Sequence, residues 1–265
     1  MPFTKMTGIG NDYIYFDGIT HAIPVDQIIA ITPKISKRRF GIGSDGVIFI
    51  LPSENADARM QMHNADGSRS EMCGNGLRCV MAYCLYHLTD KSTVRIETDA
   101  GIAQGRFTKD GLIQVEMFGE PLIENEKETL HVGDRIFSFS RVNVGNPHAV
   151  IAHDHIDDIP LEIWGPAIEN NKNLFPHRVN TEFYEVISPG HVKMRVWERG
   201  SGETYACGTG AAAVAAVYRK ICQLDQIKVT LLGGDLTFTF NPNQFLMTGP
   251  ATYVASGSLD LEGWI

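Results

Sequence analysis

The sequence predicts an α+β protein built from two similar halves. Short runs of alternating apolar and polar residues are typical of half-buried strands, and two longer runs have the apolar pattern of buried helices. In addition, one phrase occurs twice, as MCGNGLRC from residue 72 and as ACGTGAAA from residue 206, each time directly before a helical run. A phrase repeated in the same local setting indicates an internal repeat, and hence two halves of related structure.

The strands are predicted from alternation of apolar and polar residues, which places one face of each run in the core. The clearest runs are 92–101, 111–118, 191–200 and 235–241. The segment 119–141 is polar and carries no motif, so we expect it to hold a connection and edge strands.

The two helices follow the repeated phrase. After Gly76, apolar residues recur with the 3.6-residue period of a helix, at Leu77, Val80, Met81, Cys84, Leu85 and Leu88. After Gly210 comes AAAVAAVYRKI, which is rich in small helix formers and apolar nearly all round. Both segments are therefore predicted to be buried helices.

Cys73 and Cys207 stand at the N-termini of these helices. Amide N–H groups of a first helical turn form a site suited to a carboxylate or phosphate, and glycine lets an anion approach the backbone closely. The positive end of a helix also lowers the pKa of a thiol. Two thiols over one anion site could remove a proton from one side of a carbon and return one to the other side, which inverts a stereocentre.

Alternatives to this interpretation remain open. A single Cys-Gly-x-Gly phrase is also compatible with an ordinary loop before a helix, and a non-catalytic binding or thiol-redox protein could carry two such cysteines. Cys79, Cys84 and Cys222 lie in or just after apolar helical runs, so we expect all three to be buried and inert.

Composition restricts the classes of function. The net charge of −8 argues against binding to nucleic acid or to an anionic membrane surface. No run approaches the length of a membrane-spanning helix, and the first 18 residues lack the pattern of a secretion signal. Five cysteines, an odd number, favour a reducing compartment, so we expect a cytoplasmic protein. Zinc-type Cys and His pairs and phosphate-binding glycine loops do not occur, so neither a metal nor a cofactor is expected.

Six motifs resemble those of the diaminopimelate epimerase family and occur in that family's order. They are FTKMTGIGNDY (3–13), GIGSDGVI (41–48), NADGSRSEMCGNGLRC (64–79), NVGNPHAV (143–150), RVNTEFYEV (178–186) and VWERGSGETYACGTGAAA (196–213). The resemblance covers nearly the whole chain. It implies cofactor-independent interconversion of LL- and meso-2,6-diaminopimelate, a reaction that serves lysine or peptidoglycan precursor synthesis, and it implies a homodimer.

The fold implied by the resemblance is a pair of pseudo-symmetric α+β domains, each a curved mixed sheet wrapped around one central helix. We expect an N-terminal half over residues 1–117, which carries Cys73, and a C-terminal half over 118–265, which carries Cys207. The last residues, from about 254 to 265, are expected to return to the first half.

The resemblance also implies roles for individual residues. Cys73 and Cys207 would be the two acid/base thiols. The amides that hold the carboxylate at the reacting end would be those of Gly74, Asn75, Gly208 and Thr209. The residues that match contacts to the distal amino-acid end are Asn64, Asn146, Asn180 and Arg199. Asn11 and Glu198 match contacts to the ammonium groups and the near end, and His148 together with Glu198 would support the proton chemistry of the thiols.

Two positions depart from the family pattern. Many relatives have glutamine where this chain has Gly46, and His63 stands where an aromatic or apolar residue is expected. A proline racemase or hydroxyproline epimerase is the alternative within the same fold, because it uses the same thiol pair on a substrate with one amino-acid end. The set Asn64, Asn180, Glu198 and Arg199 argues against it.

Overall fold

The computed structural model describes residues 1–264, which divide into two units. Unit 1 contains residues 1–118 together with the C-terminal segment from Thr248, and unit 2 contains Gly119–Met247. The returning segment thus begins before the expected tail near residue 254, because the strand that it carries pairs with the first strand of the chain along nearly its whole length.

Unit 1 has two helices, α1 (Val25–Ile35) and α2 (Gly74–His87). Its strands are β1 (Pro2–Gly8), β2 (Asn11–Asp17), β3 (Gly46–Leu51), β4 (Ala58–Asn64), β5 (Arg69–Ser70), β6 (Thr93–Thr98), β7 (Gly101–Phe107), β8 (Ile113–Glu116) and β18 (Thr252–Ser258). The sheet is mixed. β2 and β3 pair in parallel, as do β4 and β6, and the other neighbours are antiparallel.

Unit 2 has the helices α3 (Leu161–Glu169) and α4 (Gly208–Cys222) and the short 3₁₀ helix η1 (Ile156–Asp158). Its strands are β9 (Leu122–Val132), β10 (Arg135–Asn143), β11 (Pro147–Ala152), β12 (Asn180–Ser188), β13 (His191–Glu198), β14 (Gly202–Glu203), β15 (Gln226–Leu231), β16 (Gly234–Asn241) and β17 (Gln244–Gly249), whose end leads back into unit 1. Here β11 and β12 are parallel, as are β13 and β15.

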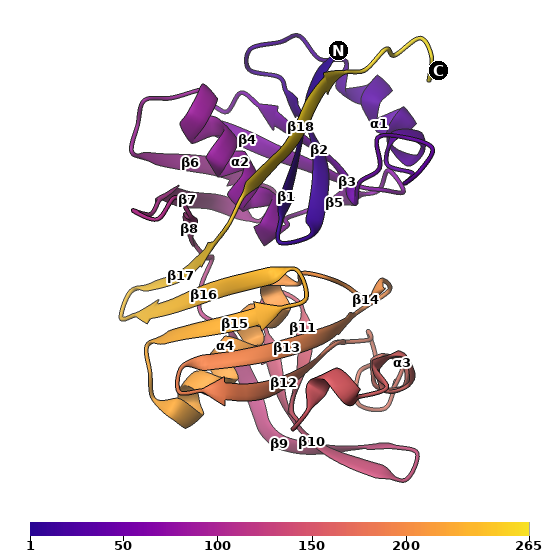
Figure 1. Ribbon diagram of the computed structural model, residues 1–265, viewed down its shortest axis with the longest axis vertical. Coiled ribbons are helices and arrows are strands. Elements are labelled where there is room, and N and C mark those ends of the chain that lie inside the picture. Colours follow the sequence, from indigo (N-terminus) through magenta and orange to yellow (C-terminus); the bar gives the residue numbers. More distant parts are fainter. Residues whose placement is uncertain (265) are drawn as a thin grey trace. The chain divides into compact units, whose positions relative to one another are not determined.

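The two units repeat one pattern of elements. A hairpin is followed by a surface helix, a parallel strand, an antiparallel strand, a two-residue strand and a central helix, and then by three more strands. β18 pairs antiparallel with β1 in unit 1 just as β9 pairs with β10 in unit 2, so the C-terminal strand completes the first sheet (Figure 1). The predicted α+β fold with two pseudo-symmetric halves is confirmed.

Each sheet curves around its central helix. α2 packs against strands β1, β2, β4, β6, β7 and β8, and α4 packs against β10, β11, β12, β13, β15 and β16. Burial on all sides explains why the predicted helices are apolar nearly all round. Alanines 211–213 and 215 are completely buried, and so are Cys79, Val80 and Met81.

A second core covers the outer face of each sheet. In unit 1, Ile28, Ile31 and Ile35 of α1 pack on the β2–β3 side. In unit 2, Leu161, Trp164 and Ile168 of α3 pack on β10–β12. Each curved sheet therefore buries both of its faces, which is what two apolar faces require for stability.

Most predicted elements agree with the structure, and two expectations need correction. The four predicted strands correspond to β6, β8, β13 and β16. Segment 119–141, expected to hold a connection and edge strands, does contain strands, but they fill most of it as the long β9–β10 hairpin, and β10 is paired on both sides. Cys222 is only half-buried, because it is the last residue of α4, whereas Cys79 and Cys84 are buried as expected.

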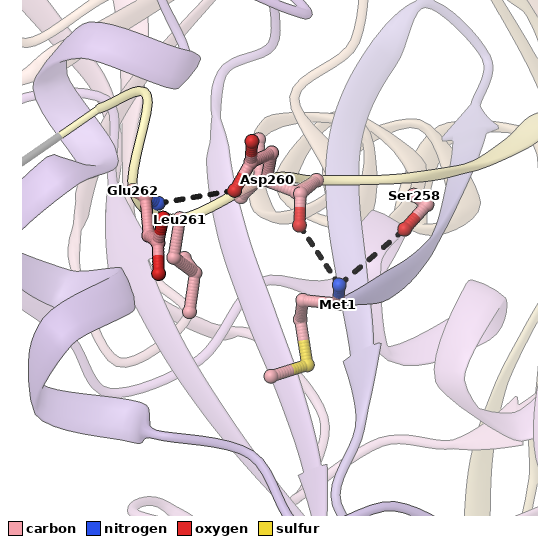
Figure 2. A pocket seen from close by; sticks show the side chains of 6 residues that line it. Met1, Ser258, Asp260, Leu261 and Glu262 are labelled. Carbon is pink, nitrogen blue, oxygen red and sulfur yellow. Dashed lines mark hydrogen bonds between the residues drawn. The ribbon is translucent and has the colours of Figure 1, made fainter.

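Met1 contacts the segment at the end of β18 in unit 1. The Met1 amine donates to the Leu259 carbonyl at 2.8 Å and to Ser258 Oγ at 3.4 Å (Figure 2). A shallow depression of about 400 Å³ is lined there by Met1 and residues 258–262. These contacts fix β18 beside β1 and so close the sheet around α2.

Candidate active site

Cys73 is the N-cap of α2. Its backbone is extended, its Sγ accepts a hydrogen bond from the Gly76 amide at 3.4 Å, and its carbonyl accepts from Leu77 at 2.8 Å. Gly76 packs closely on β3, because a Cβ there would lie 2.6 Å from Ile48 Cδ1. The thiol is thus held at the helix N-terminus, where backbone amides lack intrahelical acceptors.

Cys207 caps α4 in the same way. Its Sγ accepts from the Gly210 amide at 3.3 Å, and its carbonyl accepts from Ala211 at 2.9 Å. A Cβ on Gly210 would lie 2.7 Å from Glu182 Oε1 of β12. The repeated phrase therefore has one structural explanation, which is a cysteine N-cap followed by a glycine that packs on the sheet.

The four residues expected to supply amides to a carboxylate are the first two of each helix. Gly74 and Asn75 open α2, and Gly208 and Thr209 open α4. First-turn amides of this kind form the usual anion site of a helix N-terminus.

Asn11 lies beside Cys73 in unit 1. Its Oδ1 accepts a hydrogen bond from Cys73 Sγ at 3.1 Å and lies 3.5 Å from Asn75 Nδ2. Its Nδ2 donates to Asp45 Oδ2 at 2.8 Å. Because a carboxylate can only accept, Asp45 fixes the orientation of the amide and turns its oxygen toward the thiol.

Asp45 is itself held by charge. Arg38 Nη2 donates to Asp45 Oδ1 at 3.0 Å and to Asp12, whose other oxygen lies 2.8 Å from Lys5 Nζ. The Asp12 amide also donates to Asp45 at 3.1 Å. This network ties the loop before β3 to the start of β2 behind Asn11.

Asn64 is the last residue of β4 and lies opposite Gly46 in the register. Its side chain donates to Ser68 Oγ at 3.0 Å, so this bond holds it within its own turn. Gly46 has φ of 154°, and a Cβ there would lie 2.1 Å from the His63 carbonyl oxygen. A glutamine at this position therefore requires a shift of β4.

His63 has a structural role. It is buried edge-on against Phe49 with ring centroids 6.0 Å apart, and its Nδ1 lies 3.0 Å from the Gly67 carbonyl oxygen. It thus fills the expected apolar position and also holds the turn that follows Asn64.

Four polar side chains form a hydrogen-bonded chain in unit 2 that leads to Cys207. His148 Nδ1 donates to Glu182 Oε1 at 2.7 Å, and both side chains are completely buried. His148 Nε2 lies 2.9 Å from Asn146 Oδ1, and Asn146 Nδ2 donates to Thr209 Oγ1 at 3.5 Å. The Thr209 hydroxyl lies 3.6 Å from Cys207 Sγ, so the chain ends at the thiol.

Glu198 approaches Cys207 from the end of β13. It accepts a hydrogen bond from Thr204 and is hydrogen-bonded to Cys207. Burial raises the pKa of its carboxyl, and the nearby Glu182 acts in the same direction. A carboxyl with a raised pKa in contact with a thiol can accept and return a proton.

The helix N-terminus does not lower the pKa of Cys207. Burial raises it well above the ordinary value, and the carboxylates of Glu198 and Glu182 raise it further. Hydrogen bonds from Thr209 and the Gly210 amide act in the opposite direction but are outweighed. The expectation of a lowered pKa is therefore wrong for this thiol, because the carboxylates and desolvation exceed the effect of the helix.

Asn180 and Arg199 lie together. Asn180 is buried at the start of β12, and its Nδ2 donates to the Pro147 carbonyl at 3.1 Å. Its Oδ1 accepts from the Arg199 amide at 2.9 Å. The Arg199 side chain is exposed and donates to the His177 carbonyl at 3.1 Å, which leaves its remaining donors available to a ligand.

Sequence reasoning missed three residues of this site. Asp45 and Glu182 lie inside quoted motifs, and Tyr13 stands beside Cys73 with a pKa raised chiefly by burial. Glu182 carried no distinctive signal, because its strand also contains Asn180, Thr181 and a second acidic residue, Glu185. Within residues 1–264, no cluster of three or more His, Cys, Asp or Glu side chains has the arrangement of a metal site, and no helix is long and apolar enough to cross a membrane.

Comparison with known proteins identifies the family. The sequence model described as diaminopimelate epimerase matches residues 3–123 and 140–254, which is most of the chain. The chain belongs to the diaminopimelate epimerase family.

Individual relatives agree with this assignment. A protein named diaminopimelate epimerase from Methanococcus maripaludis is 45% identical to this chain, and the match covers 98% of this chain and 100% of that protein. A protein of the same name from Acetivibrio thermocellus is also 45% identical, and the match covers 99% of both chains. Among solved structures, a probable proline racemase from Agrobacterium radiobacter superposes with a TM-score of 0.73 at 14% identity, covering 98% of this chain and 93% of that one. At 14% identity, the similarity to this solved structure shows the fold alone.

Proposed function

We propose that this protein epimerises 2,6-diaminopimelate between its LL and meso forms without a cofactor, and that Cys73 and Cys207 are its acid/base pair. The observation that carries the proposal is the equivalent setting of the two thiols, each an N-cap beside first-turn amides. Membership of the family supports the substrate.

The reaction follows from the chemistry of the thiols. One cysteine, as thiolate, takes the proton from the α-carbon and becomes a thiol. The other cysteine, as thiol, delivers its proton to the opposite face and becomes a thiolate. Charge and protons balance over the step, and the amides of Gly74, Asn75, Gly208 and Thr209 stabilise the carboxylate on which negative charge develops.

The remaining residues suit a substrate with two amino-acid ends. The Arg199 guanidinium can bind the distal carboxylate with two parallel hydrogen bonds, and Asn64, Asn146 and Asn180 supply neutral donors and acceptors. Asn11 and Glu198 are assigned to the near end and its ammonium group. His148 is assigned to the support of proton transfer, through Asn146 and Thr209.

A substrate panel tests the proposal against its alternative. The purified protein, without added cofactor, is expected to convert LL-diaminopimelate to the meso form and to leave L-proline and trans-4-hydroxy-L-proline unchanged. Racemisation of proline or epimerisation of hydroxyproline would favour the alternative reaction of the same fold. Inversion of the α-carbon in none of the three compounds would favour a binding or thiol-redox protein.

We further propose a cytoplasmic homodimer whose product serves lysine or cell-wall synthesis. The odd number of cysteines supports a reducing compartment. Light scattering coupled to size-exclusion chromatography tests the oligomeric state, with twice the chain mass as the expected result and the single-chain mass as the contrary one.

A further inference from the structure

Glu182 and Ile48 occupy equivalent positions in the two units. Glu182 is the third residue of β12, and Ile48 is the third residue of β3. Each of these strands pairs in parallel with the strand before it, β11 or β2. Both residues also pack against the second glycine of the cysteine phrase. A Cβ on Gly210 would lie 2.7 Å from Glu182 Oε1 and 3.2 Å from Cys207 Sγ, and a Cβ on Gly76 would lie 2.6 Å from Ile48 Cδ1. The backbone repeat therefore places a carboxylate near one thiol and a methyl group near the other.

The same contrast holds at two more equivalent positions. His148 stands two residues after Asn146, and Tyr13 stands two residues after Asn11. Glu198 ends β13, and Asn64 ends β4. The charged and titratable groups around the N-terminus of α4 include Glu182 from β12, Glu198 from β13 and His148 from β11, whereas the matching residues of unit 1 (Ile48, Asn64 and Tyr13) carry no charge. The charges near Cys73 are instead the buried Arg78 guanidinium of α2, which favours a thiolate, and Asp45, which lies behind Asn11.

The Glu182 carboxylate is held in a fixed position. Its Oε1 accepts from His148 Nδ1 at 2.7 Å, and its side chain is completely buried. Its Oε2 is also buried and has no hydrogen-bond partner among residues 1–264. Burying a carboxylate with an unsatisfied oxygen costs free energy, so packing alone does not favour a glutamate at this position.

We propose that Glu182 is a positioning residue which keeps Cys207 protonated in the substrate-free enzyme, so that Cys207 is the resting proton donor and Cys73 the resting acceptor. This inference rests on the proposed two-thiol function. A negative charge beside a thiol disfavours the thiolate, and here that charge is paired with His148 and cannot move away from the first turn of α4. The Cys73 side lacks such a charge at the equivalent position because Ile48 is apolar.

The protonation of each thiol can be measured directly. Protein labelled with ¹³C at the cysteine β-carbons is titrated without substrate, and the signals are assigned by comparison with Cys73→Ala and Cys207→Ala. In the parent, the Cys207 signal should titrate at a higher pH than the Cys73 signal. In Glu182→Gln, the Cys207 midpoint should fall by about one pH unit or more, with little change at Cys73.

Two further variants sharpen the test. Glu182→Ile recreates the residue of unit 1 and should lower the Cys207 midpoint as well. Glu185→Gln removes a carboxylate from the opposite face of the same strand, where it accepts from the Ile156 amide, and should leave both midpoints in place. Amide spectra check that each variant is folded. If Glu182→Ile does not fold, the nearly isosteric Glu182→Gln decides the outcome.

A folded Glu182→Gln protein with an unchanged Cys207 midpoint would overturn the inference, and so would a parent in which Cys73 titrates at or above Cys207. The titration uses no substrate, so the two proposals can fail separately. A shifted midpoint in a protein that does not epimerise diaminopimelate would retain the role of Glu182 in proton placement and reject the proposed function.

Discussion

The side-chain amide of Asn11 donates from Nδ2 to Asp45 Oδ2 at 2.8 Å. This bond turns the amide oxygen toward Cys73, whose Sγ lies 3.1 Å away. Asp45 therefore determines that the oxygen, and not the nitrogen, of the Asn11 amide faces the thiol. Its own position is fixed by Arg38 and by the Asp12 amide.

Asp45→Asn is therefore expected to impair catalysis more than folding. An amide at position 45 can donate as well as accept, so Asn11 is no longer held in one orientation, and kcat/KM should fall by about 10-fold or more. Asp110→Asn, in an exposed turn, is the matched control and should be neutral. Equal kcat/KM values for the parent and the Asp45 variant would show that the orientation of Asn11 is unimportant.

The two glycines of the repeated phrase should differ in their tolerance of a methyl group. At Gly210 the new methyl meets a carboxylate oxygen that is bonded to His148, and at Gly76 it meets the movable end of Ile48. Gly210→Ala should therefore lower the free energy of unfolding by about 1–3 kcal/mol. Gly76→Ala should cost less, because Ile48 can change rotamer. Urea unfolding of both variants measures the difference, and equal losses would contradict the assigned contacts.

Arg199→Ala should weaken substrate binding without a large change in stability. The side chain is exposed, and its contact with the His177 carbonyl is its one intramolecular bond that the structure records within residues 1–264. The free energy of unfolding should change by less than about 0.5 kcal/mol. Loss of a charge-assisted pair with the distal carboxylate should raise KM by about 10- to 100-fold. An unchanged KM would show that Arg199 does not bind the substrate. Arg199→Lys keeps the charge but not the planar guanidinium group, so it measures how much of the effect depends on two parallel hydrogen bonds.

Stability should fall at alkaline pH because three thiols are buried. Burial raises the pKa of Cys79 to about 11 and that of Cys84 to about 12, and it also raises the pKa of Cys207. Thiols in the unfolded chain ionise at about pH 8.5. Above that pH, the unfolded state therefore binds fewer protons than the folded state. The stabilisation is complete below about pH 8.5 and declines as pH rises toward the folded pKa values.

Cys84→Ala isolates one of these contributions. Between about pH 9 and pH 11, the free energy of unfolding should decline less steeply with pH in Cys84→Ala than in the parent. The difference between the two slopes should be up to about 1.4 kcal/mol per pH unit, which is the contribution of one proton. Urea unfolding at both pH values provides the measurement. Parallel pH dependence in the parent and the variant would mean that this thiol does not stay protonated in the folded state.

Local patterns in the sequence predicted both cysteine N-caps, the central helices and several strands, whereas the wrapping of each sheet around its central helix was predicted from the family resemblance. Helical periodicity after Cys73 and Cys207, and alternation in segments such as 191–200, are set by short-range geometry. The extent of the β9–β10 hairpin was not predicted, since β9 is polar and mostly exposed, although Phe137 and Phe139 of β10 alternate with serines.

The electrostatics of the site could not be obtained in this way. The pKa of Cys207 depends on Glu182 and Glu198, which reach the thiol from two other strands. A single sequence indicates that a cysteine begins a helix, but not which buried carboxylates pack against that helix. For the same reason Asp45 was quoted within a motif without its role as the partner of Asn11.

The most direct test of the two-thiol mechanism is the reaction of LL-diaminopimelate in D₂O with the parent protein, Cys73→Ala and Cys207→Ala. The parent should form meso product that carries one solvent deuterium at the inverted α-carbon. Each alanine variant should lose epimerisation by a factor of about 10³ or more, because one thiol cannot serve both faces of the carbon. Near-normal turnover by either variant, or meso product without deuterium, would contradict the mechanism.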